Sequence, residues 1–142
     1  MTVFSTNTKV EALRKAPLFE GLARRELIEL AKVTDDLEVE PGKVLCKEGQ
    51  PAREFFVIVD GEVEVRKRGK NVTTLGPGDF FGEIALIEHG TRTATVTAKT
   101  PLRFFVLHSR AFNGLMDSAP GVERKVLRAL ARRVLGDSDP TL

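Results

Sequence analysis

The residues best suited to chemistry lie in one segment, residues 75–98 (LGPGDFFGEIALIEHGTRTATVTA). It places an acid, Glu83, directly after Gly82, and an arginine, Arg92, nine positions further along. Glycine lets a ligand approach the backbone closely, and the arginine fork matches the geometry of carboxylate and phosphate groups. These residue types at this spacing indicate that the segment binds an anion.

The chain that follows Arg92 alternates between small apolar and polar residues. Ala94, Val96 and Ala98 share one parity, while threonines and a lysine take the other. Because successive side chains of a strand point to opposite faces, an inward-facing apolar set turns Arg92 inward as well. A buried guanidinium is costly unless an anion satisfies it.

Two kinds of anion could satisfy an inward Arg92. One is a carboxylate of the chain itself, Glu83 or Asp79, in an internal salt bridge. The other is a bound phosphate, because Gly82 and a short helical turn that begins at Glu83 would offer exposed backbone N–H groups. In the second case Glu83 accepts hydrogen bonds from a sugar hydroxyl. Spacing alone favours the phosphate only slightly.

Short strands are expected to position this segment. Between residues 35 and 108 the apolar period is two, in runs such as EFFVIVD and EVEVRK, and turns with glycine or proline separate the runs. Many short strands at close spacing predict a barrel or jelly roll. Helical patterns precede it, at about residues 8–33, and follow it, at about residues 109–135, before a tail at 136–142.

The last predicted helix is amphipathic and basic. Its apolar residues fall four apart and form one stripe: Val122, Val126, Leu130 and Val134. Its basic residues are Arg124, Lys125, Arg128, Arg132 and Arg133. The cations could meet nucleic acid, an acidic partner or a membrane surface, although a solvated face is more common. The stripe would pack on the barrel or against the same helix of a second chain.

Residues 81–94 (FGEIALIEHGTRTA) resemble the phosphate-binding cassette of the cyclic nucleotide-binding domain family, F-G-E-[IL]-A-L-x-x-x-x-x-R-[AST]-A. Thr91 stands where the family often has proline. The resemblance extends over residues 19–135 and includes FFVIVDGEVEVRK, which looks like paired central strands that turn at Gly61. It implies an α+β, mainly β fold: an eight-stranded jelly-roll barrel with flanking N- and C-terminal helices, in a single domain over residues 1–142.

The resemblance also implies a role for each site residue. Glu83 would accept the ribose 2′-hydroxyl, Arg92 would neutralise the cyclic phosphate, and Gly82 would complete the cradle with backbone amides near Ala85 and Thr93. The other ligand-binding candidates are Ile84, in the helical turn, and the apolar walls around sugar and base: Phe81, Leu75, Val72 and Val63. In such domains the final helix often folds over the purine, so Val126 or Leu130 would form a lid.

The expected function is a cyclic-nucleotide sensor that has no catalytic activity and no cofactor. We favour cAMP, because a stand-alone cytosolic domain of this type looks bacterial. Thr93 leaves cGMP as an alternative ligand, since in some cGMP-responsive members of the family a threonine after the arginine contacts guanine. The expected partners are the nucleotide and either an effector protein or a second copy, which would bind through the last helix.

Composition sets wider limits. With 22 basic and 20 acidic residues the net charge is +2, which is too balanced to indicate nucleic-acid binding. The sequence has no apolar run long enough to span a membrane and no secretory signal at its start. Cys46 is the only cysteine, which excludes an internal disulfide and fits a reducing compartment. We therefore expect a cytoplasmic protein that does not insert into membranes.

Three other functions compete with the sensor. A transcription regulator would need a helix-turn-helix after the barrel, and the 142 residues leave no room for one unless they are the sensor fragment of a longer regulator. A metal enzyme would need clustered ligands, but the two histidines, His89 and His108, are 19 positions apart. The third alternative is a nucleotide-free structural barrel in which the cassette only holds Glu83 to Arg92.

Overall fold

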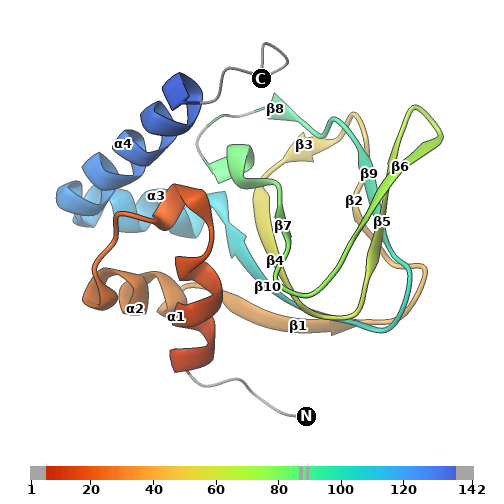
Figure 1. The fold of residues 1–142 in the computed structure, drawn as a ribbon, viewed down its shortest axis with the longest axis horizontal. Coiled ribbons are helices and arrows are strands. Elements are labelled where there is room, and N and C mark those ends of the chain that lie inside the picture. The colour runs from red at the N-terminus through yellow and green to blue at the C-terminus, as the bar shows by residue number, and fades with distance from the viewer. Residues whose placement is uncertain (1–5, 87, 89, 137–142) are drawn as a thin grey trace.

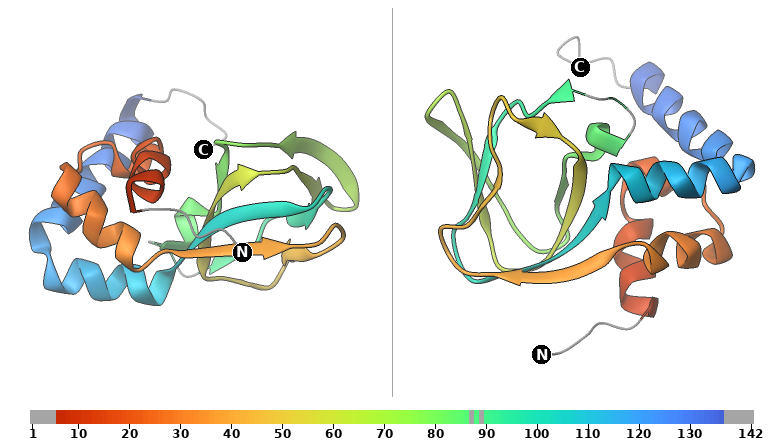
Figure 2. Two further views of the ribbon diagram at one scale, coloured as in Figure 1. Left: turned by 90° about the horizontal axis from the view of Figure 1, so that it is seen from below. Right: turned by 180° about the vertical axis from the view of Figure 1, so that it is seen from behind.

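The computed structural model describes residues 6–86, 88 and 90–136 (Figure 1). Within this range the side chains of residues 6, 83, 84 and 133–136 are left undescribed. The strands form a barrel, and four α-helices gather against one side of it, as the two further views in Figure 2 also show. None of the described helices is both long enough and apolar enough to cross a membrane.

Two antiparallel sheets of four strands each build the barrel. The first has the order β1 (Asp35–Val39), β10 (Leu102–His108), β4 (Glu54–Asp60) and β7 (Phe80–Phe81). The second has the order β2 (Val44–Cys46), β9 (Thr95–Ala98), β5 (Val63–Lys67) and β6 (Lys70–Leu75). These eight strands confirm the predicted jelly roll. A further pair that the sequence analysis missed joins β3 (Pro51–Ala52) to β8 (Gly90–Thr91).

Residues 55–59 of strand β4 are all apolar because both faces of the strand are covered. Phe56 and Ile58 belong to the apolar cluster inside the barrel, whereas Phe55 and Val57 belong to a second cluster beneath the helices. A strand that is buried on both faces carries a continuous apolar run rather than an alternating one. The EFFVIVD run therefore places β4 between the barrel interior and the helical layer.

The turn between β4 and β5 requires glycine. Gly61 has a φ of 93°, and a Cβ atom there would lie 2.2 Å from the carbonyl oxygen of Pro101. The turn between β5 and β6 is different, because its left-handed positions are held by Arg68, with a φ of 54°, and Gly69. Arg68 is the one described residue other than glycine with a positive φ.

The helical layer is built from helices at both ends of the chain. Its members are α1 (Thr6–Arg14), the 3₁₀ turn η1 (Pro17–Phe19), α2 (Arg24–Lys32), α3 (Ser109–Ser118) and α4 (Pro120–Gly136). The apolar stripe of α4 packs into the cluster that these helices share, where Val122 and Val126 are buried and Leu130 is partly buried. The fourth residue of the stripe, Val134, is among the undescribed side chains.

Two ion pairs fasten α4 to the N-terminal helices. Lys125 Nζ lies 2.7 Å from Glu26 Oε1, and Arg132 Nη2 lies 3.1 Å from Glu20 Oε1. Together with the buried stripe they place α4 against η1 and α2. Val126 and Leu130, the predicted lid residues, therefore lie in the helical core of this structure.

Candidate functional site

Arg92 is fixed by its backbone immediately after β8. Its N–H donates to the carbonyl of Gln50 (2.8 Å), and its own carbonyl accepts from the N–H of Gly49 (2.9 Å). The side chain turns into the barrel and is only 9% exposed. Val96 and Ala98, on the same parity, are buried as well. The side chain of Arg92 therefore points into the barrel, as predicted.

Strand β4 supplies the surroundings of the guanidinium. Arg92 Nη2 donates to the backbone carbonyl of Glu54 (3.0 Å) and lies 3.6 Å from its carboxylate oxygen Oε1. The Cζ atom lies 5.7 Å from the ring centroid of Phe56, within the range of a cation–π contact. The guanidinium is thus held by one carbonyl, one partly exposed carboxylate and one aromatic ring.

Gly82 fits closely against this arginine. Its φ is +82°, and a Cβ atom there would lie 2.7 Å from Arg92 Nη1 and 2.7 Å from the Glu54 carbonyl oxygen. No side chain fits in that space unless the arginine or β4 moves. The predicted helical turn follows as the 3₁₀ helix η2 (Glu83–Leu86), in which the N–H of Ala85 donates to the carbonyl of Gly82 (3.0 Å).

The other predicted site residues divide into three groups. Val63 is fully buried in the barrel cluster, and Leu75 and Phe81 pack against it. Val72 on β6 is 59% exposed, and Thr93 is exposed. The side chains of the third group, Glu83 and Ile84, and the whole of His89 lie outside the described part of the chain.

Phe81 is linked to Arg92 through an aromatic neighbour. Its ring stacks on that of Phe56, with centroids 4.6 Å apart and planes at 17°, and Phe56 in turn lies under the guanidinium. The structure therefore brings Gly82, Phe81 and Arg92 together in the barrel, while Val72 and Thr93 lie at the surface.

Glu54 is the site residue that sequence reasoning missed. It is 38 positions from Arg92 in the chain, so only the closed barrel brings the two together. The carboxylates proposed as internal partners were Glu83 and Asp79, but the Asp79 carboxylate accepts from the N–H of Gly76 (2.8 Å) instead. The one available signal was an acid at the first position of a strand whose residues 55–59 are all apolar.

Cys46 faces the same interior, where burial disfavours the thiolate form of its side chain. It is buried in the barrel cluster, and burial raises the pKa of its thiol to about 11, although the nearby Arg92 charge partly opposes that rise. A thiol with so high a pKa is a poor nucleophile at neutral pH. In this environment Cys46 is a packing residue of the barrel.

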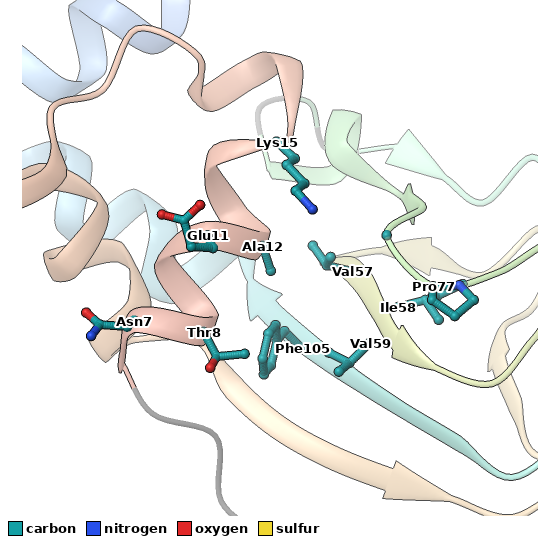
Figure 3. Close-up of a pocket in the computed structure, with 11 residues that line it drawn as sticks. Asn7, Thr8, Glu11, Ala12, Lys15, Val57, Ile58, Val59, Pro77 and Phe105 are labelled. Atoms are coloured by element: carbon teal, nitrogen blue, oxygen red, sulfur yellow. The ribbon is translucent and has the colours of Figure 1, made fainter.

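A separate cleft of about 560 Å³ lies between α1 and the outer face of the first sheet (Figure 3). Val57 and Phe105 form part of its floor, and Ala12 of α1 and Lys15, just after that helix, form part of one wall. Phe56 and Arg92 lie on the opposite face of β4, so this cleft is not the predicted anion site. In the described part of the chain, no three His, Cys, Asp or Glu side chains gather in a way that could hold a metal ion.

Comparisons of sequence identify a protein family and several relatives of the chain. The family model "Cyclic nucleotide-binding domain" matches residues 36–119. A cyclic nucleotide-gated potassium channel of Mesorhizobium japonicum is 40% identical over 106 residues, which cover 75% of this chain and 29% of the channel. The regulatory subunit of cAMP-dependent protein kinase from Schizosaccharomyces pombe is 36% identical over 118 residues, or 82% of this chain and 29% of the subunit. A CRP-like cAMP-activated global transcriptional regulator of Mycobacterium tuberculosis is 28% identical over 129 residues, or 87% of this chain and 58% of the regulator. The chain thus spans between 29% and 58% of these relatives.

Solved structures show the same architecture. The N-terminal domain of a transcriptional regulator from Streptomyces coelicolor A3(2) superposes with a TM-score of 0.83 at 30% identity, covering 91% of this chain and 96% of that one. A cyclic nucleotide-binding-like protein from Brucella abortus superposes with a TM-score of 0.72 at 26% identity, covering 78% of this chain and 98% of that one. With its jelly roll, its cassette glycine and its inward arginine, the chain belongs to the cyclic nucleotide-binding domain family.

Proposed function

We propose that this barrel binds a cyclic nucleotide and works as a sensor without catalytic activity of its own. The observation that carries the proposal is the position of Arg92. Its side chain is nine-tenths buried, and the guanidinium lies beside Gly82, where there is no room for another side chain. An arginine fork fixed in this way is suited to a phosphate group, which supplies several acceptor oxygens.

The remaining contacts follow the cassette. Glu83 accepts the ribose 2′-hydroxyl, and the backbone of Gly82 and Thr93 lies along the phosphate. The amide of Ala85 already donates to the Gly82 carbonyl, so it reaches the phosphate only if η2 gives up that hydrogen bond. Ile84 completes the helical turn, and the apolar residues around sugar and base are Val63, Val72, Leu75 and Phe81. Of these, Val72 starts from an exposed position on the edge strand β6.

We infer that cAMP is the preferred nucleotide and that the protein acts in the cytoplasm. Support for cAMP comes from the names of two relatives, a regulatory subunit of cAMP-dependent protein kinase and a cAMP-activated transcriptional regulator. Thr93 supports the alternative, cGMP, because its exposed side chain is available to a guanine. The ratio of the two affinities decides between them.

The output of a sensor requires a movement that the ligand favours. Helix α4 is the element to consider, because the Lys125–Glu26 and Arg132–Glu20 ion pairs hold it on the N-terminal helices. The ligand shifts α4 only if it binds more tightly to one of the helix positions than to the other. The receiver is an effector protein or a second copy of the chain.

A second candidate is a structural barrel that binds no nucleotide. The observation in its favour is that Arg92 already has a partner, since Glu54 offers both its carbonyl and its carboxylate. The carboxylate is 35% exposed and stands 3.6 Å away, so the ion pair contributes only about 0.5 kcal/mol. That is too little to account for a buried arginine by itself.

Calorimetric titration separates the two candidates. Protein that is folded and free of ligand is titrated with cAMP and with cGMP, and both titrations are repeated with Arg92→Ala. The matched control is Arg110→Ala, which removes an exposed arginine of α3. We expect micromolar or tighter binding that Arg92→Ala abolishes and Arg110→Ala preserves. Absence of heat with either nucleotide would support the structural barrel.

A further inference from the structure

The hairpin of β5 and β6 carries a dense group of cations at its tip. We call residues 66–70 (RKRGK) the basic turn; its four charged residues are Arg66, Lys67, Arg68 and Lys70, and all are exposed. Figure 1 shows that this hairpin extends beyond the rest of the barrel. Glu64 pairs with Arg66 (2.6 Å). The basic turn therefore presents a strong local positive charge on a protein whose net charge is only +2.

Two features of the basic turn lower the stability of the free protein. Lys67 stands directly opposite Lys70 in the register of the two strands, and like charges at such positions repel each other. Arg68 adopts a left-handed φ of 54°, which asparagine or glycine would adopt at lower cost. The N–H of Arg68 donates to Glu48 Oε1 (2.9 Å), which holds the strained residue in place. A bound anionic group would relieve the repulsion.

The strand that leaves the basic turn has an open edge. Strand β6 is the last member of the sheet β2-β9-β5-β6, and among the strands that the structure describes it pairs with β5 alone. Its side chains are exposed from Lys70 to Thr74. A terminal strand presents unpaired backbone N–H and C=O groups, which can accept an added strand.

We propose that β6 and the basic turn bind an extended acidic segment of a partner protein by strand addition. Backbone groups of the segment pair with the free edge of β6, and its carboxylates meet Lys67, Arg68 and Lys70. A bilayer or a nucleic acid duplex would contact the cations but would leave the strand edge unpaired. A second copy of β6 would bring the same lysine charges together. This proposal does not depend on nucleotide binding.

The first test measures peptide binding to the full chain by fluorescence anisotropy. The probe is a labelled peptide of alternating glutamate and valine, about eight residues long, which is a usual strand length. One control peptide is N-methylated at alternate residues, which keeps the charge and removes the ladder. A second control has lysine in place of glutamate. We expect only the first peptide to bind, and less tightly as salt is added.

Variants locate the binding surface. Lys67→Glu combined with Lys70→Glu should weaken binding at least about tenfold, since it places like charges against the peptide. The matched control is Arg124→Glu combined with Arg128→Glu, a reversal of two exposed cations on α4, which should leave binding unchanged. Arg68→Asn should raise the melting temperature of the protein and yet weaken its binding of the peptide. Arg92→Ala should not alter peptide binding, so failure here is distinguishable from failure of the nucleotide proposal.

Three results would overturn the proposal. Equal binding of the plain and N-methylated peptides would mean that charge alone acts and no strand is added. Binding to duplex DNA or to phosphatidylserine vesicles, without binding to the acidic peptide, would assign the cations to another partner. The third result is that the double variant Lys67→Ser, Lys70→Ser aggregates while the parent protein binds no acidic peptide. The lysines would then only protect an exposed strand edge from aggregation. Circular dichroism of each variant verifies that it is folded.

Discussion

Replacing Gly82 by alanine perturbs the contact between the cassette and Arg92. The added Cβ atom would lie 2.7 Å from Arg92 Nη1 and 2.7 Å from the carbonyl oxygen of Glu54. The carbonyl belongs to the backbone of a buried central strand and has little freedom to move. We therefore expect the guanidinium to be pushed out of its position, and the φ of +82° to add backbone strain.

The size of the effect follows from these two causes. A left-handed φ costs about 1–2 kcal/mol for a residue with a Cβ atom, and an overpacked site costs about 1–3 kcal/mol more. The Gly82→Ala variant should therefore lose about 2–5 kcal/mol of unfolding free energy. A chain of this size loses about 3 °C of melting temperature per kcal/mol, so the expected decrease is about 6–15 °C.

Gly42→Ala is the matched control for strain alone. Gly42 has a φ of +92°, and a Cβ atom there would meet no other atom within 4 Å. This variant should lose only the conformational part, about 1–2 kcal/mol, and should bind cAMP like the parent protein. Thermal unfolding and calorimetry are measured on both variants. Equal destabilisation by the two, with nucleotide binding intact in Gly82→Ala, would refute the reasoning about Arg92.

Three further predictions concern charged and reactive groups. Glu54→Gln should raise affinity for cAMP about threefold, because it removes a negative charge beside the phosphate position; calorimetry that finds weaker binding would contradict this. Cys46 should resist iodoacetamide at pH 8 in the folded protein and react after denaturation, since its pKa is raised to about 11; rapid alkylation of the native state would be the opposing result. Lys125→Ala should cost about 0.5–1 kcal/mol at neutral pH. The hydrogen bond from Lys125 lowers the pKa of Glu26, so the loss of stability should disappear as acid protonates the Glu26 carboxyl. Urea unfolding measures this loss at each pH. A loss that is unchanged at low pH would show that the ion pair does not cause it.

The inward position of Arg92 was predicted from the local alternation of apolar and polar residues. Val96 and Ala98 are buried as that alternation requires, although β9 begins only at Thr95 and Arg92 lies before it. The buried strand β4 was equally legible from its continuous apolar run. Both inferences were drawn from the expected period of a strand, without knowledge of distant contacts.

Contacts between distant segments could not be predicted from the sequence. Glu54 and Arg92 are 38 positions apart, and Glu26 and Lys125 are 99 apart, so neither pair has a periodic signal. The apolar stripe of α4 was visible, but its spacing is the same whether it packs on the barrel, on other helices or on a second chain. The pairing of β3 with β8 involves two residues from each strand, too few to form a pattern.

The most direct test of the central claim observes the arginine itself. Side-chain nitrogen NMR of the protein, with Arg92 assigned by comparison with Arg92→Lys, follows the guanidinium resonances during titration with cAMP. Arg103 serves as an internal reference, because it pairs with Asp36 (3.0 Å) on the outer face of the barrel. If the phosphate binds as proposed, the Arg92 resonance shifts and saturates with the calorimetric affinity, while that of Arg103 does not change. Saturating cAMP that leaves the Arg92 resonance in place would contradict the account.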